Sequence, residues 1–78
     1  MMQYVTQWFR VGIDHPSRPG EYEVQPLGWA DPQRVTWNER WMPAEAFVPS
    51  AAWGDKWRGL YGDPALALFE RKVSDNAG

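Results

Sequence analysis

The sequence predicts a mainly β domain, a small α+β fold in which an antiparallel meander of four or five short strands has an aromatic core and a short C-terminal helix. Three observations predict this fold. Seven Pro and seven Gly interrupt the 78 residues too often for long helices. Segments rich in β-branched and aromatic residues recur between these breaks. Leu, Ile, Val and Phe together number only 14, so six Trp and three Tyr must supply much of the core.

The first half of the chain is expected to hold three strands. Residues 4–11 (Y-V-T-Q-W-F-R-V) are rich in strand-forming types, and residues 14–20 (D-H-P-S-R-P-G) form a loop because two prolines fix φ. Residues 21–25 (E-Y-E-V-Q) alternate polar and apolar side chains, as on a half-buried strand that Pro26 ends. After a turn region at 27–33, residues 34–37 form the third strand.

The second half is expected to be more irregular. A fourth strand begins at Trp41, residues 43–47 (P-A-E-A-F) suit one helical turn with Pro at its first position, and residues 57–61 form a final strand. Asp63 and Pro64 are typical of a helix N-terminus, and apolar residues at helical spacing extend that helix to residue 73, although a strand there also fits the pattern. All 78 residues form one domain, with residues 74–78 as a frayed tail.

Four of the six tryptophans stand in two similar brackets, W-N-E-R-W at 37–41 and W-G-D-K-W at 53–57. In a hairpin, a two-residue turn would separate the two Trp onto opposite faces, whereas a three-residue turn would pair them on one face. We favour a two-residue turn at Gly54-Asp55. The turn length of the first bracket is left undecided, since Glu39 disfavours the positive φ of a type I′ turn. At least one Trp in each bracket is expected to be well buried and one partly exposed.

Composition excludes several functions. The net charge of −2 and the scattered Lys and Arg do not suit nucleic-acid binding. With no Cys, one His and no glycine-rich phosphate loop, we expect no metal, no cofactor and no enzymatic activity. The N-terminus lacks a signal-peptide pattern and the chain has no long apolar run, so the expected location is the cytoplasm, without a membrane partner.

The leading interpretation is a small module that binds another protein through exposed aromatic and Arg side chains, the types that dominate interfaces. An aromatic platform for a glycan, a Pro-rich peptide or single-stranded nucleic acid is one alternative. A structural accessory protein that self-associates is the other, and the chain is accordingly expected to be a monomer or a homodimer. The candidate binding residues are Trp29, Arg40, Trp41, Trp53 and Arg58.

Three motifs resemble a loose group of small uncharacterised phage and prophage proteins: P-G-E-Y-E-V at 19–24, W-N-E-R-W at 37–41 and W-R-G-L at 57–60. Glu39 stands where that group favours Gly, and residues 61–78 extend past its usual end. The resemblance carries over no catalytic residue. It implies a phage or prophage origin and the host cytoplasm as the location, rather than a mechanism. Combined with the protein-binding interpretation, it makes a host or defence protein that the chain blocks the expected partner.

Overall fold

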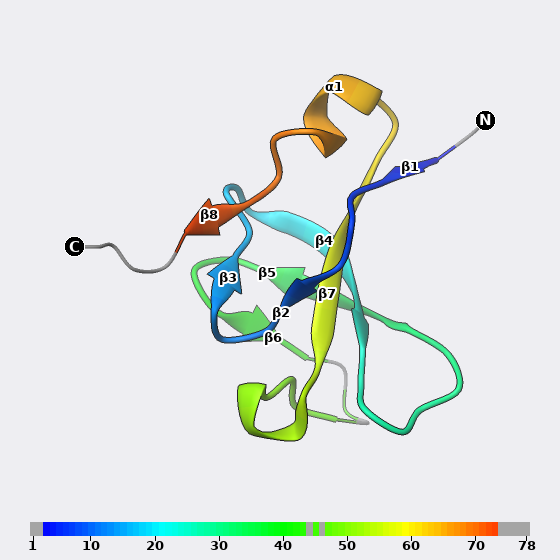
Figure 1. Cartoon of the computed structure of the whole chain (residues 1–78), viewed down its shortest axis with the longest axis vertical. Helices are drawn as coiled ribbons and strands as arrows, with labels where there is room; N and C mark the ends of the chain where they lie inside the picture. The colour runs from blue at the N-terminus through cyan, green and yellow to red at the C-terminus, as the bar shows by residue number, and fades with distance from the viewer. Residues whose placement is uncertain (1–2, 44, 46, 74–78) are drawn as a thin grey trace.

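Strand β7 (Lys56–Tyr61) lies inside an antiparallel six-stranded sheet in the computed structural model, which describes residues 3–43, 45 and 47–73 (Figure 1). The sheet has the order β1-β7-β4-β5-β6, and β2 also pairs with β7. The other elements are β1 (Tyr4–Val5), β2 (Phe9–Arg10), β3 (Asp14–His15), β4 (Gly20–Gln25), β5 (Gln33–Trp37), β6 (Trp41–Met42), a 3-10 turn (Ala51–Trp53), α1 (Pro64–Ala67) and β8 (Lys72–Val73). The predicted mainly β fold is therefore confirmed.

The strands expected at 21–25, 34–37, 41–42 and 57–61 are all present as β4, β5, β6 and β7. Along β4 the side chains of Tyr22 and Val24 are buried, while the alternating residues Glu21, Glu23 and Gln25 are exposed or partly exposed, as the alternation predicted. β4, β5 and β6 form a meander. The chain then returns to the far side of β4, where Val24 pairs with Trp57.

The single strand expected at 4–11 is wrong in detail, because a bulge divides it into β1 and β2. Val5 pairs with Leu60 and Phe9 with Trp57, so three residues of the first strand lie opposite two of β7. Thr6 closes the gap: its N–H donates to the Gly59 carbonyl at 3.2 Å, and its hydroxyl accepts from the Gly59 N–H at 2.8 Å.

Aromatic side chains form much of the core, as predicted. Trp57 and Tyr22 are both 0% exposed, and their rings meet edge to face at 5.5 Å between centroids. The buried hydrophobic residues are Phe9, Val11, Tyr22, Val24, Val35, Phe47 and Trp57. Such large flat rings compensate for the scarcity of aliphatic side chains.

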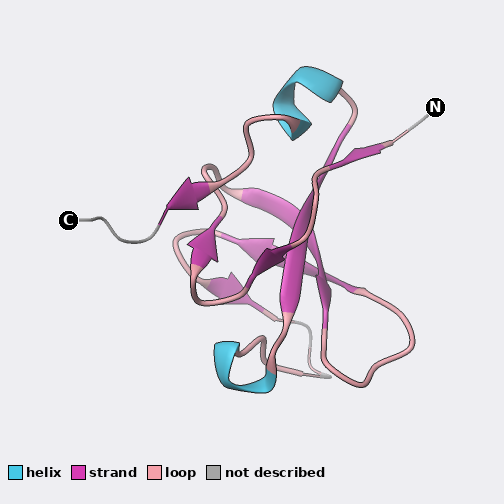
Figure 2. Ribbon diagram, in the orientation of Figure 1, coloured by secondary structure: helices cyan, strands magenta, loops and turns pink. Residues whose placement is uncertain are grey.

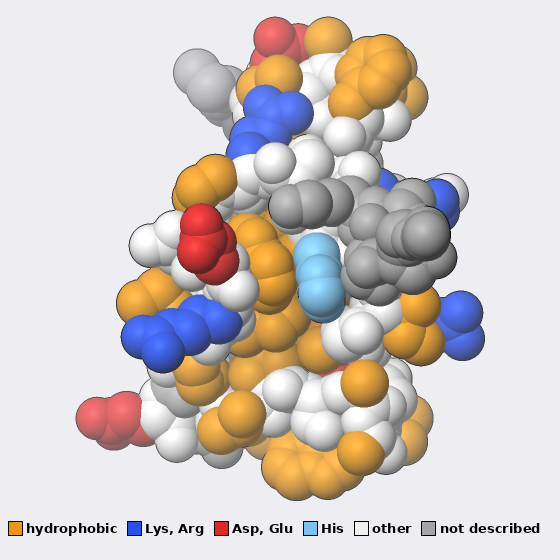
Figure 3. All heavy atoms as spheres, turned by 90° about the vertical axis from the view of Figure 1, so that its left-hand side faces the viewer, with side chains coloured by type: hydrophobic (Ala, Val, Ile, Leu, Met, Phe, Trp, Pro, Cys, Tyr) orange, Lys and Arg blue, Asp and Glu red, His pale blue; other side chains and the backbone are white. Residues whose placement is uncertain are grey.

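The first Trp bracket is a hairpin with a three-residue turn. Trp37 pairs directly with Trp41, and their rings lie 4.9 Å apart at 66°. Both rings are half-buried, so the expectation of one well buried Trp is wrong here. Trp37 also stacks on His15 at 5.2 Å, and Figure 3 shows hydrophobic side chains beside the single histidine. A direct cross-strand pair keeps both indoles on one face of the sheet, where each is only partly buried by its neighbours.

The second bracket is not a hairpin, so the two-residue turn at Gly54-Asp55 is wrong. Trp53 ends the 3-10 turn, Gly54 caps it at φ 80°, and Trp57 already belongs to β7. The burial expectation is confirmed for this bracket, because Trp57 is 0% and Trp53 57% exposed.

The C-terminal helix begins as predicted but is short. The Asp63 carboxylate accepts from the Ala65 N–H at 2.9 Å and Pro64 occupies the first turn, yet α1 ends at Ala67. Phe69, expected on the apolar helix face, is 74% exposed. The chain instead turns so that the Glu70 side chain is buried, and β8 then pairs with β3. The pairing also corrects the prediction of a continuous loop at 14–20.

The two short helical segments lie at opposite ends of the molecule, with α1 at the top and the 3-10 turn at the bottom of Figure 2. Part of the helical turn expected at 43–47 and the whole tail at 74–78 lie outside the described residues. Among the residues that the structure does describe, no helix has both the length and the apolar character of a membrane span.

Candidate binding groove

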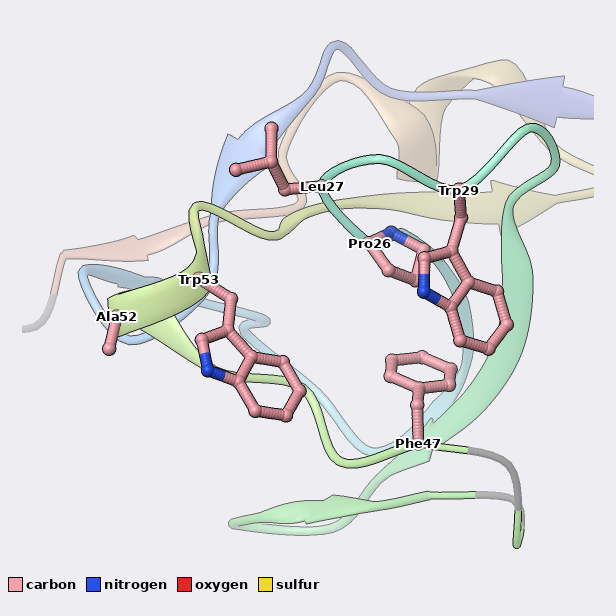
Figure 4. A pocket seen from close by; sticks show the side chains of 6 residues that line it. All are labelled: Pro26, Leu27, Trp29, Phe47, Ala52 and Trp53. Atoms are coloured by element: carbon pink, nitrogen blue, oxygen red, sulfur yellow. The ribbon is translucent and has the colours of Figure 1, made fainter.

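An apolar groove of about 600 Å³ lies between the loop after β4 and the segment that leads into β7 (Figure 4). It is lined by Pro26, Leu27, Trp29, Phe47, Ala52 and Trp53. Trp53 is 57% exposed, Leu27 72% and Trp29 40%, so large apolar surfaces face solvent on both walls. Solvent-exposed apolar surface gathered in a concave site is typical of a binding region.

A tight turn builds the first wall. Pro26 ends β4, Gly28 adopts φ 87°, and the Trp29 N–H donates to the Pro26 carbonyl at 3.1 Å. The Gln25 amide donates to the Trp29 carbonyl at 2.6 Å and fixes the backbone from the other side. The Trp29 ring then packs on Phe47 at 5.2 Å between centroids, so its orientation is set before any ligand arrives.

The 3-10 turn builds the second wall. The Ser50 hydroxyl accepts from the Ala52 N–H at 3.1 Å at the start of the turn. At its end the Gly54 N–H donates to the Ala51 carbonyl at 3.1 Å. None of the three residues in the turn is buried, so the Trp53 ring is held outward by backbone geometry.

Asp55 joins the two walls. Its side chain is buried, with 1% of the residue exposed, and each carboxylate oxygen accepts from a different wall. The Leu27 N–H donates to Oδ1 at 3.2 Å, and the Ser50 N–H donates to Oδ2 at 2.9 Å. A buried carboxylate with two backbone donors is a strong link, because its bonds are charge-assisted. The groove is therefore largely preformed.

The structure brings together two of the predicted binding residues, Trp29 and Trp53, on facing walls of the groove. Trp41 lies instead against the core, with its ring 6.1 Å from both Tyr22 and Trp57. Its indole nitrogen is buried and has no hydrogen-bond partner among the described residues. Trp41 is thus not part of the groove.

The two predicted Arg residues also lie outside the groove. Arg40 is exposed in the turn between β5 and β6. Arg58 pairs with Glu23 at 2.7 Å, and its guanidinium lies 4.4 Å from the Trp8 ring centroid. The Arg58 charge is therefore already neutralised within the protein.

Sequence reasoning missed Phe47, Leu27 and Asp55 as parts of the site. A signal was present: apolar residues stand in P-L-G-W at 26–29 and in F-V-P-S-A-A-W at 47–53, where neither strand nor helix periodicity offers a face to bury them. Asp55 carried no such signal, because its role depends on two backbone N–H groups far apart in the sequence.

The titratable groups gather elsewhere, around the buried Glu70. Its Oε2 accepts from the Ser17 N–H at 2.6 Å and from the Tyr22 hydroxyl at 2.7 Å. Arg18 Nε lies 3.0 Å from Oε1, an ion pair without hydrogen-bond geometry. The Tyr61 hydroxyl donates to that of Tyr22 at 3.0 Å. The cluster ties the segment after α1 to the loop before β4 and to the sheet.

Burial raises the pKa of the Tyr22 hydroxyl above its ordinary value, and the hydrogen bonds with Tyr61 and Glu70 raise it further. Burial likewise raises the pKa of Tyr61 and Glu70 raises it further, while Tyr22 and Arg18 partly offset the rise. Both phenols therefore stay neutral in the folded protein well into alkali.

No protein-family model, curated protein or solved structure matches the chain. Within residues 3–43, 45 and 47–73, no three His, Cys, Asp or Glu side chains are placed to share a metal ion.

Proposed function

We propose that this protein is a non-enzymatic protein-binding module, and that the groove between Trp29 and Trp53 holds an apolar segment of the partner. The observation that carries the proposal is the pair of exposed indoles on facing walls, with Phe47 between them and Asp55 fixing the walls from behind. Aromatic side chains that are already ordered bind with little further loss of conformational entropy. Tryptophan is also enriched among the residues that dominate binding energy.

The lining of the groove favours a protein segment over a sugar or a nucleic acid. All six lining residues are apolar, so the only polar side-chain atoms among them are the two indole nitrogens. A sugar needs several hydrogen-bonding groups around it, and a nucleic acid needs cations along its backbone. An apolar peptide segment needs neither of these in the groove itself.

The resemblance to phage and prophage proteins extends the proposal to the partner and to the location. On this reading the partner is a host or defence protein in the host cytoplasm, and occupation of the groove blocks its activity. A second copy of this chain is the other occupant to test, by sedimentation over a series of concentrations.

A displayed library of random peptides, selected against the wild-type protein, tests the groove directly. We expect the selected peptides to lose at least about fivefold in affinity for Trp53→Ala, because truncation of a central aromatic residue typically removes more than about 1 kcal/mol. The matched control is Phe69→Ala, which removes another aromatic ring that is 74% exposed and does not line the groove.

Both substitutions are expected to leave the fold unchanged by circular dichroism, since neither ring is buried. Selected peptides that bind Trp53→Ala and Phe69→Ala equally well would refute the groove as the binding site. Failure to select any peptide, with sedimentation showing a dimer that Trp53→Ala dissociates, would assign the groove to self-association instead.

A further inference from the structure

We infer that the partner segment is rich in proline, extended, and acidic at the end that leaves the groove. The inference rests on the proposed function and specifies the chemistry of the ligand. Two observations carry it. Two cations beside the groove make no ion pair with any described residue, and the six described side chains that line the groove contain no hydrogen-bond acceptor.

The cations are Arg10 and Lys56, which lie directly opposite each other on β2 and β7. Their neighbours Phe9 and Trp57 point into the core, so the alternation of a strand directs Arg10 and Lys56 outward on the same face. Neither makes an ion pair with any described residue, and the Lys56 ammonium lies 5.9 Å from the centroid of the Trp8 ring. Two like charges directly opposite each other destabilise a strand pair. A site for an anion would explain why both positive charges are present at this position.

These cations lie next to the groove. Arg10 and Lys56 line a second hollow of about 320 Å³, whose wall includes Ala51, Gly54 and Asp55. The Asp55 carboxylate is buried there, and its two oxygens already accept from the N–H groups of Leu27 and Ser50. Ala52 and Trp53 of the same turn line the groove. The turn is therefore a ridge, with the apolar groove on one side and the two cations on the other. A segment that crosses this ridge from the groove brings its next residues to Arg10 and Lys56, where a carboxylate would be attracted.

The groove itself suits proline. Its side chains offer hydrogen-bond donors only, the indole N–H groups of Trp29 and Trp53, and neither has a partner among the described residues. In Figure 4 the ring nitrogen of Trp29 lies on the edge of the ring toward the Trp53 side. A polyproline II segment matches this arrangement, because its carbonyls are free to accept while its prolines have no N–H to leave unpaired. Such segments dock between aromatic rings in other small domains.

Four fluorescent peptides test the inference by anisotropy titration. The first has a central Pro-Leu-Pro-Pro run with glutamates at both ends. The second has alanine for each proline, and the third and fourth have lysine or serine for each glutamate. We expect the first to bind most tightly, the alanine peptide about tenfold more weakly, and the lysine peptide most weakly. We also expect the affinity of the first to fall as salt is added, since exposed charges are screened.

Charge-removing variants assign the effect to the cations. Lys56→Gln and Arg10→Gln should each weaken the glutamate peptide by about two- to fivefold, the scale of an exposed ion pair, and leave the serine peptide unchanged. Arg40→Gln removes the same charge from an exposed turn outside both hollows and should leave all four affinities unchanged.

The outcomes separate this inference from the function on which it rests. Equal affinities for the proline and alanine peptides, or for the glutamate and lysine peptides, would overturn the inference. The proposed function would still stand if Trp53→Ala abolished that binding. Affinities that Trp53→Ala leaves unchanged would refute both.

Discussion

Glu39 occupies a backbone conformation that suits glycine. Its φ is 65°, and it is the only non-glycine residue with positive φ among the described residues. The conformation follows from the three-residue turn that pairs Trp37 with Trp41, because such loops place one residue in the left-handed region. A residue with a Cβ is disfavoured there by roughly 1–2 kcal/mol.

Glu39→Gly is therefore expected to raise the free energy of unfolding by about 1 kcal/mol, somewhat less than the strain it relieves because glycine gains more freedom in the unfolded chain. Urea unfolding followed by Trp fluorescence measures the change. Arg40→Gly is the matched control: it stands next in the same turn but does not have a positive φ, so it should not stabilise. Equal effects of the two substitutions would show that turn strain is not the cause.

The six tryptophans have different structural roles, although the two brackets are similar in sequence. Trp57 belongs to the core, Trp37 and Trp41 are half-buried cover on a hairpin, and Trp29 and Trp53 face the groove. Trp8 lies under the Arg58 guanidinium. The similarity of W-N-E-R-W and W-G-D-K-W therefore reflects no repeated structure.

At the scale of elements, the groove depends on one carboxylate shared by two loops. Asp55→Asn keeps the size of the side chain but leaves a single acceptor oxygen for the N–H groups of Leu27 and Ser50. The new amide N–H₂ would face one of these donors. We expect the free energy of unfolding, measured by urea titration, to fall by about 1–3 kcal/mol, which is the cost of a buried donor without an acceptor.

The same substitution should also weaken peptide binding at the groove, since the walls lose their link. Asp31→Asn is the control, because that exposed residue is in the loop that carries Trp29 and has no side-chain hydrogen bond among the described residues. Its expected effect on stability is within about 0.5 kcal/mol. Wild-type stability and affinity in Asp55→Asn would show that the walls are held by packing alone.

The elements themselves were predictable where one local pattern decides the structure. The alternation of polar and apolar residues at 21–25 predicted β4, and Asp63 with Pro64 predicted the start of α1. The bulge after β1, the early end of the helix and the pairing of β3 with β8 were not predictable, because each depends on contacts between distant residues. Glu70 is the clearest case. In the sequence it looks like an ordinary helix residue, yet its carboxylate is buried and hydrogen-bonded to Tyr22, which is 48 residues away in the chain, and the helix ends before it.

The candidate site shows the same division. Exposed Trp was expected to bind, and Trp29 and Trp53 do line the groove. Their meeting could not be predicted, since it requires two loops to be joined through Asp55. Trp41 was indistinguishable from them in sequence, and only the register of β5 and β6 places it against the core.

At the scale of the whole molecule, the Glu70 cluster joins parts of the chain that the six-stranded sheet does not. The segment after α1 is held to the loop before β4 through Ser17 and Arg18, and to β4 itself through Tyr22. The Tyr22 hydroxyl has one hydrogen, so it donates either to Glu70 or to the Arg18 carbonyl, 2.6 Å away, at any moment. Loss of the phenol protons would leave negative charge beside a buried carboxylate.

This arrangement predicts unfolding in alkali. The pKa values of Tyr22 and Tyr61 are raised in the folded protein, whereas in the unfolded chain they are about 10. Their contribution to stability is therefore complete below about pH 10 and is lost as the pH rises toward the folded-state pKa values. In that range the free energy of unfolding should fall by about 1.4 kcal/mol per pH unit for each tyrosine, measured by urea titration at a series of pH values.

Tyr61→Phe separates this effect from every other effect of alkali on stability, since the variant and the wild type share those. The variant removes one of the two phenols and should lower the slope by about 1.4 kcal/mol per pH unit, while Tyr22 keeps its bond to Glu70. Ultraviolet titration of tyrosinate should show the same two groups ionising only when the protein unfolds. Two results would contradict this prediction: Tyr61→Phe keeps the wild-type slope, or all tyrosines of the folded protein ionise near pH 10. Either would mean that solvent reaches the cluster and that the C-terminal segment does not cover it.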